Sequence, residues 1–339
     1  MDRFDHYVAV DWAQRNMAIA RMTARSGKIT TVDVPASVKD LQVYLGELHG
    51  KVALTLEEST ASQWLYTELK SHVHELIVCD PYRNHLLKEG AKTDKADAEK
   101  LVRLLRGGLL KPVFHSGDEF IYMRKLVSGY IDLVKSGVRL KNQRAALFRA
   151  NGIAPGKGEL EQPAELFVVD GLERGIASYQ EEKLRYESEF SRLCKKHKML
   201  RLLVSIPGIA EIGAMKVASR IVDPHRFPTK GAFLSYCGLI RLDQISGGRS
   251  YGTRTSRHCP MLKEVFKTAA LTATVDGVNH SFRHFYQYLM REKGYPEHQA
   301  RHAVARRVAV LTWGVIKSGK PFKPNPEWRP PSQAKRTRS

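Results

Sequence analysis

Residues 6–11, HYVAVD, are a run of apolar residues that ends in an acid, which is typical of a short buried strand. Two stretches of alternating apolar residues follow at 16–22 and 29–34, and a Ser-Gly pair between them indicates a hairpin. These three segments predict an antiparallel meander, with Asp11 at the end of its first strand.

Beyond residue 35, strand patterns alternate with helix patterns. Apolar residues recur at helical spacing in three segments, 37–48, 62–70 and 94–105. Two short apolar runs, 52–56 and 75–79, predict further strands. Three antiparallel strands followed by alternating strands and helices match the strand order of an RNase H-like fold. We therefore expect an α/β RNase H-like domain over residues 1–116.

The pattern changes at residue 118. Apolar residues three, four or seven apart predict one long amphipathic helix over 118–150, and a second long helix is expected from 173 to about 198, after a loop over 155–163. Together they predict a coiled-coil arm over residues 117–198. Residues 159–189 hold nine acids and three bases, so the positive charge of the protein lies elsewhere.

Residues 199–324 predict a third, mostly helical domain. Its segment Ile206-Pro207-Gly208-Ile209 lies between apolar helical stretches and resembles a helix-hairpin-helix turn. Such turns direct backbone N–H groups at phosphates, which makes Gly208 a candidate nucleic-acid contact.

The net charge of the 339-residue chain is +20, which predicts a polyanionic partner, and nucleic acid is the first candidate. Residues 283–339 carry 13 Lys and Arg against 3 Asp and Glu, which is half of the excess. Arg306 and Arg307 in this region are candidate nucleic-acid contacts. Residues 325–339 are expected to form a flexible basic tail.

Several classes of protein are excluded by pattern. No apolar run approaches the roughly 18–20 residues that span a bilayer, and the N-terminus places acids where a signal peptide has a basic stretch. We therefore expect no membrane partner and a cytoplasmic protein associated with the nucleoid. The four cysteines form no C-x-x-C pair, so neither a disulfide framework nor a structural zinc site is expected.

Four acids could form a catalytic group: Asp11, Glu58, Asp94 and Asp97. The first two lie at the ends of predicted strands, and the other two are one turn apart at a helix start, about 5–6 Å between Cβ atoms. Carboxylates brought together need a cation between them, and oxygen ligands without Cys or His favour Mg²⁺. The alternative is that Asp94 caps the helix and Asp97 is a solvated first-turn acid.

A predicted loop rich in glycine, serine and arginine offers a nucleophile. Ser246 precedes two glycines that leave its hydroxyl accessible, and three arginines near it could hold a phosphate, Arg249, Arg254 and Arg257. The alternative is a flexible basic loop that only contacts the DNA backbone. Ser256 is the one competing serine.

In order and spacing, these segments resemble the DEDD transposases of the insertion-sequence 110 group, which includes the Piv invertases. The matching segments are VAVDWA (8–13), EST (58–60), VCDPYRNHLLKEGAKTDKADAEKL (78–101), SIPGIAEIGA (205–214) and residues 236–266. The resemblance selects Glu58 over Glu57 and places the family's catalytic serine at Ser246. The sequence departs from the family at Ala61, at Asp80 and at Cys259-Pro260, where the family has glycine, asparagine and Gly-Asn.

The resemblance implies a RuvC-like domain, a coiled-coil arm and a serine-bearing transposase domain. It further implies a covalent phosphoserine link to a cut strand, an acidic site that binds Mg²⁺, donor and target double-stranded DNA as substrates, and a homo-oligomer, either a dimer or a tetramer. Members of the family whose mechanisms are well understood are guided by a bridge RNA, which makes RNA a further expected partner.

Three other functions remain open from the residues. A RuvC-like junction nuclease needs the four acids but not Ser246. A protein-only DNA invertase needs the acids and the serine but no RNA. A DNA-binding repressor explains the charge and leaves the acids without a purpose.

Overall fold

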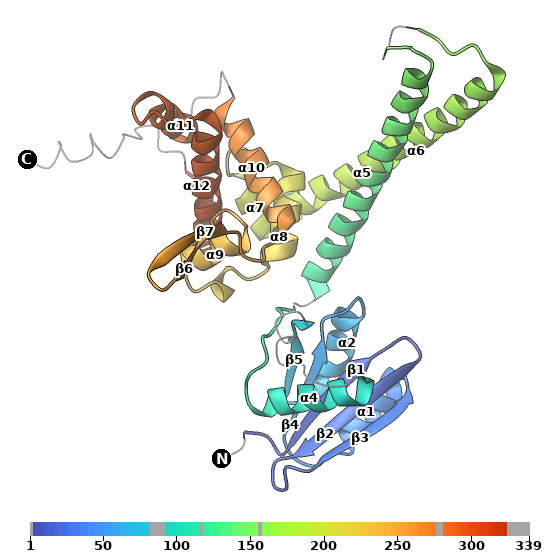
Figure 1. The fold of residues 1–339 in the computed structure, drawn as a ribbon, viewed down its shortest axis with the longest axis vertical. Coiled ribbons are helices and arrows are strands. Elements are labelled where there is room, and N and C mark those ends of the chain that lie inside the picture. Colours follow the sequence, from blue (N-terminus) through green and yellow to red (C-terminus); the bar gives the residue numbers. More distant parts are fainter. Residues whose placement is uncertain (1–2, 82–92, 116–117, 155–157, 276–280, 324–339) are drawn as a thin grey trace, which may run out of the picture. The chain divides into compact units, whose positions relative to one another are not determined.

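The computed structural model describes residues 3–81, 93–115, 118–154, 158–275 and 281–323 (Figure 1). The chain divides into two compact units between residues 117 and 118. The expected basic tail, 325–339, lies outside the described residues, as does 82–92 within the segment 78–101 that resembles the family.

The first unit is built on a five-stranded mixed sheet in the order β3-β2-β1-β4-β5. Its strands are β1 (His6–Trp12), β2 (Asn16–Thr23), β3 (Ile29–Pro35), β4 (Val52–Glu57) and β5 (Glu75–Cys79). β1, β2 and β3 pair antiparallel, whereas β4 pairs parallel with both β1 and β5. The predicted meander is therefore confirmed, and the strand order is that of an RNase H-like fold.

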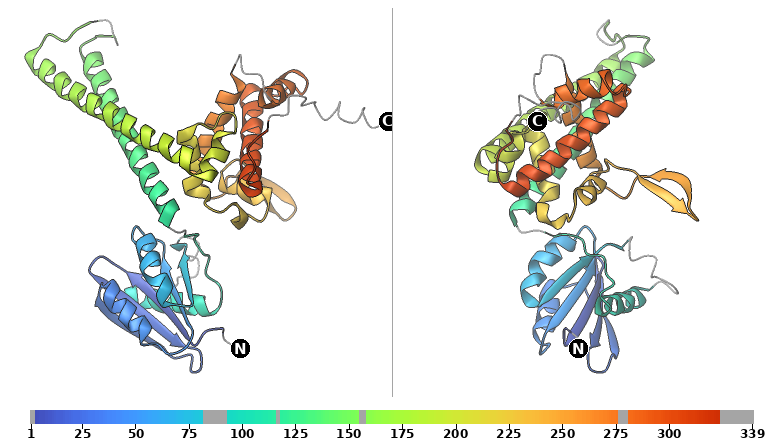
Figure 2. Two further views of the ribbon diagram at one scale, coloured as in Figure 1. Left: turned by 180° about the vertical axis from the view of Figure 1, so that it is seen from behind. Right: turned by 90° about the vertical axis from the view of Figure 1, so that its left-hand side faces the viewer.

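Helices cover both faces of this sheet (Figure 2). α1 (Val38–Gly46) and α2 (Ser62–Leu69), which runs into the short η1 (Lys70–His72), pack on the face that carries Val8 and Val10 of β1. α4 (Asp94–Arg106) packs on the opposite face, against Tyr7 and Ala9 and a set of small residues, Ala18, Ala20 and Ala53. These alanines let the helix approach the sheet closely, so that Leu101 and Val102 become fully buried.

The second unit begins with two long helices, α5 (Asp118–Ala150) and α6 (Pro163–Lys196). They run antiparallel, because Glu119 pairs with His197 at one end and Arg144 with Glu173 nearer the other. The two-helix arm was predicted, but α6 begins ten residues before the predicted start. Its first turns carry three consecutive exposed apolar residues at 166–168, which follow no helical face, while Pro163 at the first helical position starts the helix.

The rest of the second unit is a helical bundle. It comprises α7 (Lys198–Val204), α8 (Glu211–Ile221), η3 (Pro224–Arg226), α9 (Lys230–Tyr236), α10 (Pro260–Thr274), α11 (Ser281–Arg291) and α12 (Glu297–Ser318). Its core is continuous with the base of the arm, since Met123 and Val127 of α5 pack in the same cluster as Phe233 and Phe266. Among the described residues, no helix combines the length and apolar character needed to cross a bilayer.

A two-stranded hairpin projects from this bundle between α9 and α10 (Figure 2). Its strands are β6 (Leu242–Ser246) and β7 (Arg249–Arg254), and every residue of both is exposed. The loop predicted here is therefore wrong. Gly247 and Gly248 have φ of 56° and 75°, and a two-residue turn with positive φ at both positions is the connection that joins paired strands.

Candidate catalytic acids, serine and nucleic-acid contacts

Two of the predicted acids lie where parallel strands end. Asp11 is near the end of β1, and Glu58 follows β4 directly, with its backbone N–H donating to the carbonyl of Cys79. β1, β4 and β5 are parallel, so their carboxyl ends meet at one edge of the sheet. This is the edge at which α/β proteins place functional side chains.

The other two acids open α4. Thr93 caps the helix through its hydroxyl, which accepts from the N–H of Ala96, so the cap is Thr93 and Asp94 is the first helical residue. Asp94 is exposed, whereas Asp97 is only 9% exposed. Asp97 therefore is not the solvated first-turn acid of the alternative reading, although Lys100 Nζ lies 3.9 Å from its Oδ1.

Asp11 and Asp97 share one side of the sheet. Side chains alternate along β1, so Asp11 lies on the face of Tyr7 and Ala9, the face on which α4 packs. Among the described residues, however, no three His, Cys, Asp or Glu side chains are close enough together to hold a metal ion. Mg²⁺ is usually held by one or two carboxylates together with substrate phosphates, so the donor chemistry of this pair fits that ion.

Two further acids at this edge were not chosen from the sequence. Asp80 follows β5, is 9% exposed, and donates its backbone N–H to the carbonyl of Lys111. Glu57 ends β4 and has one fully buried carboxylate oxygen, whereas the neighbouring Glu58 is exposed. Asp80 follows a buried strand just as Glu58 does, and that position was the signal available in the sequence.

Ser246 is the last residue of β6 and lies beside the Gly-Gly turn at the tip of the hairpin, opposite Arg249. Within the described part of the chain, no side chain contacts its hydroxyl as a base would. Arg254 pairs with Leu242, four residues before Ser246, which places it roughly 13 Å along the ribbon. Of the three predicted arginines, only Arg249 is therefore next to Ser246, since Arg257 lies beyond the end of β7.

The hairpin is exposed along its length but fixed at its base. Ser235 and Ser256 share a hydrogen bond of 2.6 Å between hydroxyls, and Arg241 donates to the carbonyl of Thr253. Gly238 lies so close to His258 that a Cβ there would be 2.2 Å from the imidazole. A ribbon held in this way presents its tip at a defined place on the bundle.

The two arginines of α12 differ in their surroundings. Arg306 is exposed. Arg307 is half-buried, its guanidinium lies 4.6 Å from the ring centroid of Phe285, and burial lowers its pKa. The Arg307 guanidinium is thus largely engaged in packing against Phe285, whereas the exposed Arg306 side chain is free to contact a phosphate.

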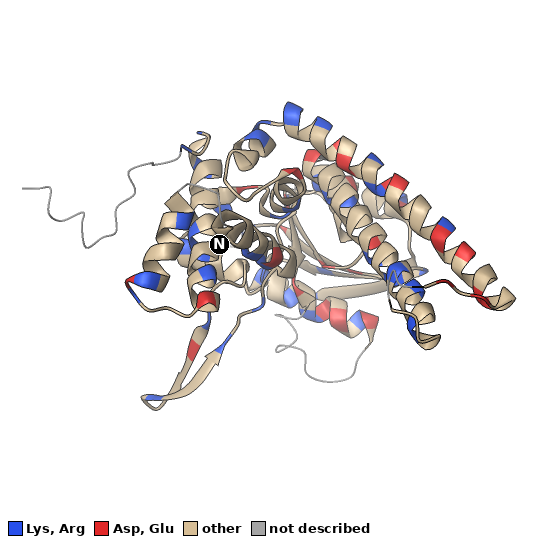
Figure 3. Ribbon diagram, turned by 90° about the horizontal axis from the view of Figure 1, so that it is seen from above, with Lys and Arg blue, Asp and Glu red and all other residues tan. Residues whose placement is uncertain are grey.

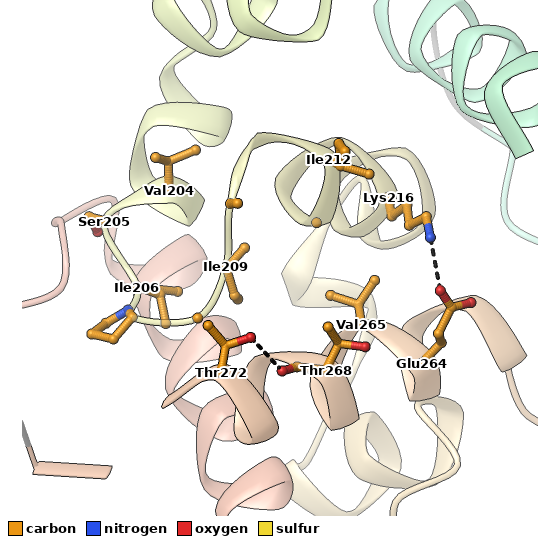
Figure 4. A pocket seen from close by; sticks show the side chains of 14 residues that line it. Val204, Ser205, Ile206, Ile209, Ile212, Lys216, Glu264, Val265, Thr268 and Thr272 are labelled. Atoms are coloured by element: carbon orange, nitrogen blue, oxygen red, sulfur yellow. Dashed lines mark hydrogen bonds and ion pairs between the residues drawn. The ribbon is translucent and has the colours of Figure 1, made fainter. Parts of the chain in front are cut away.

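The helix-hairpin-helix-like segment lies between α7 and α8 and borders a groove of about 620 Å³ (Figure 4). The groove is lined mainly by apolar residues and Gly208, and the Lys216–Glu264 ion pair of 3.1 Å lies at one side. Ala210 precedes α8 and supplies no side-chain cap, so the first N–H groups of this helix have no capping side chain. Phosphate binding by these N–H groups stays a prediction.

Gly208 itself has a packing role. Its φ is +86°, and a Cβ would lie 2.4 Å from the carbonyl oxygen of Ala269 in α10. We expect Gly208→Ala to lower the free energy of unfolding by about 2–3 kcal/mol, through strain and overpacking together. Urea unfolding measures this change. Gly213→Ala, in the first turn of α8 and with only ordinary contacts, is the matched control and should be neutral or stabilising by up to about 1 kcal/mol.

Comparison with known families agrees with this layout. Residues 8–150 match a model described as a DEDD transposase of the IS110 type, and residues 200–287 match the transposase IS116/IS110/IS902 family. Over both segments the chain is similar to transposases of the IS110 type. The first match includes all four predicted acids, and the second includes Gly208 and Ser246.

Individual relatives are distant. An insertion element IS110 protein of Streptomyces coelicolor is 23% identical over 51% of this chain and 41% of its own length. Two putative transposases of Sinorhizobium fredii, y4pF/y4sB and y4qE, are 24% and 27% identical over 80% and 76% of this chain, and 74% and 67% of their own lengths. The chain thus spans under half of the first relative, and its activity is argued below as a proposal.

The acid-rich segment 159–189 predicted that the positive charge of the protein lies outside it, and the charges of the arm bear on this prediction. Both signs occur along its two long helices (Figure 3). The acids of α6 pair with neighbouring bases, as in Asp170–Arg174, Glu182–Arg185 and Glu189–Arg192. Such pairs leave α6 with little net charge, whereas α5 carries seven Lys and Arg against three Asp and Glu.

Proposed function

We propose that this chain is a DNA transposase that cuts and rejoins donor and target DNA through a covalent phosphoserine at Ser246. The observation that carries the proposal is the placement of this serine at the tip of a fully exposed hairpin, beside Arg249 and two glycines with positive φ. A serine without a packing role, on a ribbon fixed only at its base, is placed for contact with another molecule. Ser256, by contrast, is engaged with Ser235.

The proposed chemistry conserves the phosphodiester bond. The Ser246 oxygen attacks a backbone phosphorus, the bond from phosphorus to one deoxyribose oxygen breaks, and the serine proton leaves to that oxygen. A deoxyribose hydroxyl of the other duplex then attacks the phosphoserine and returns the proton to Ser246. Because each step exchanges one phosphoester for another, the strands rejoin without ATP. Arg249 would hold the phosphate through charge-assisted hydrogen bonds.

The four acids complete the proposal. Asp11 and Asp97, on one side of the sheet, with Glu58 and Asp94 at the same end of the domain, would hold Mg²⁺ against the substrate phosphate. The ion would withdraw charge from the phosphate oxygens. Among the described residues of its own unit, no general base contacts Ser246, so we propose that the acids and the serine come together from two protomers of a homo-oligomer.

Denaturing electrophoresis of reactions with labelled donor and target duplexes tests the proposal. The cut strand must stay attached to protein after denaturation. A RuvC-like junction nuclease would release free ends instead, and a repressor would cut nothing.

Guidance by a bridge RNA is the finer part of the proposal, supported by the resemblance to the family and by the excess of +20 charges. Protein purified without nuclease treatment is expected to carry one RNA species of defined sequence. Ribonuclease should abolish recombination, and adding back that RNA should restore it. Full recombination by RNA-free protein would instead identify a protein-only invertase.

A further inference from the structure

A second groove, of about 520 Å³, lies between α10 and the first turns of α12. The α10 side is formed by Lys267, Thr268 and Leu271. The α12 side is formed by Glu297, His298, Arg301 and His302. Thr268 also borders the helix-hairpin-helix groove, so α10 separates the two hollows. Neither the catalytic acids nor Ser246 belong to this second groove.

The groove carries an excess of positive charge. Lys263 lies one turn before Lys267 on α10, and Arg306 lies one turn after His302 on α12. The one acid of the lining, Glu297, is already paired with Arg301 at 2.5 Å. Lys263, Lys267 and Arg306 form no ion pair within the described residues. The uncapped start of α12 after Pro296 adds the positive end of a long helix to the same place.

The positive charge of the groove acts on the pKa of His302. Its Nε2 lies 3.1 Å from the carbonyl oxygen of Leu239, after α9, and the ring is half-buried. Burial lowers the pKa of His302, and the charges of Arg306, Lys267 and Lys263 lower it further, against the Leu239 carbonyl, which raises it. The ring is therefore close to three cations, and no carboxylate among the described residues raises its pKa, which is an environment that favours a bound anion.

We propose that the α10–α12 groove binds phosphodiester groups of a nucleic-acid backbone, and that His302 takes up a proton when it does so. Lys267 and Arg301 would contact the phosphate oxygens directly, and Thr268 offers a hydroxyl donor at the edge. The site is independent of the proposed phosphoserine chemistry, since none of its residues belongs to the hairpin or to the first unit. A transposase that lost all cutting would still bind here.

Proton uptake follows from linkage. A phosphodiester is anionic at all working pH values, and its charge beside the imidazolium raises the pKa of His302 toward or above its ordinary value. The bound state then holds more protons than the free state between the two pKa values. Affinity therefore rises as the pH falls through this window, by up to about tenfold for each pH unit.

Fluorescence anisotropy with the full-length protein tests the site, using a 20-base-pair DNA duplex and an RNA duplex of the same sequence, each with a pH-insensitive dye. Lys267→Gln should weaken binding about fivefold at 0.15 M salt and reduce the slope of log affinity against log salt by about 1. The amide of His302→Gln can still donate to the Leu239 carbonyl but cannot take up a proton. This variant should therefore lose the part of the rise in affinity from pH 7.5 to 5.5 that His302 supplies.

Matched controls come from the same unit. Lys195→Gln removes one exposed lysine from the arm, and His225→Gln removes one exposed histidine from η3, both outside the groove. Both controls should behave as the wild type. The duplex on which Lys267→Gln and His302→Gln act is the ligand of the groove. If they change neither duplex more than their controls do, the proposal is wrong.

Discussion

Ser246→Ala is expected to abolish the covalent protein–DNA adduct and to lower strand exchange by roughly 10⁴-fold or more, since it removes the nucleophile itself. Binding of DNA should be retained, because affinity comes from basic groups elsewhere. The hairpin should also persist, because its turn is formed by two glycines and its base by Ser235, Ser256 and Arg241. Denaturing electrophoresis measures the adduct, and anisotropy measures binding.

Ser250→Ala is the matched control, because it removes a hydroxyl from the same ribbon on the strand opposite Ile245. Ser250→Ala should form the adduct at the wild-type rate. An adduct formed by Ser246→Ala would refute the assignment, and peptide mapping would then show whether Ser256 carries the link.

The same variant tests whether the site is shared. Mixing Ser246→Ala with Asp11→Ala subunits should restore part of the activity if the serine of one protomer works with the acids of another. Absence of rescue in the mixture would reject sharing between protomers and leave the role of Ser246 intact.

Regular patterns made the fold of the first unit predictable. The apolar run at 6–11 and the alternation along 16–22 and 29–34 identified three strands whose observed bounds each differ by one residue. The apolar residues of the first two strands are imposed by burial, because both faces of β1 and β2 pack in the core. The start of α6 was missed for the opposite reason. Leu166, Phe167 and Val168 are exposed, so no packing imposes a helical period on them.

The candidate site was predictable in its residues but not in its geometry. Ser246 was found from its glycines and from the family resemblance. The strands that carry it were missed, because both are fully exposed and burial imposes no apolar pattern on them. Asp80 was taken as a departure from a motif, although its position after β5 puts it at the same edge as Asp11. Contacts such as Gly238 with His258, 20 residues apart, arise from tertiary packing that no local pattern encodes.

Asp97→Asn should abolish DNA cleavage while leaving most DNA binding intact. Asp97 is buried at the start of α4, the helix that packs on the sheet face of Asp11, so its carboxylate is largely shielded from solvent. The amide keeps the volume and the hydrogen-bonding capacity but removes the negative charge that a divalent cation needs. Loss of an acid from the first turn of α4 should cost only about 0.5–1 kcal/mol of stability.

A control at another first-turn acid separates the effect on cleavage from the effect on stability. Asp40 lies in the first turn of α1 and is exposed, so Asp40→Asn loses a similar helix-end interaction far from the proposed chemistry. Cleavage assays with Mg²⁺ and with excess chelator measure the effect on catalysis, and urea unfolding of both variants measures the effect on stability. We expect Asp40→Asn to cut normally and both Asp97→Asn and chelated wild type to be inactive. If Asp97→Asn cuts at the rate of Asp40→Asn, Asp97 is a structural acid, and Glu57 and Asp80 become the next candidates at this edge.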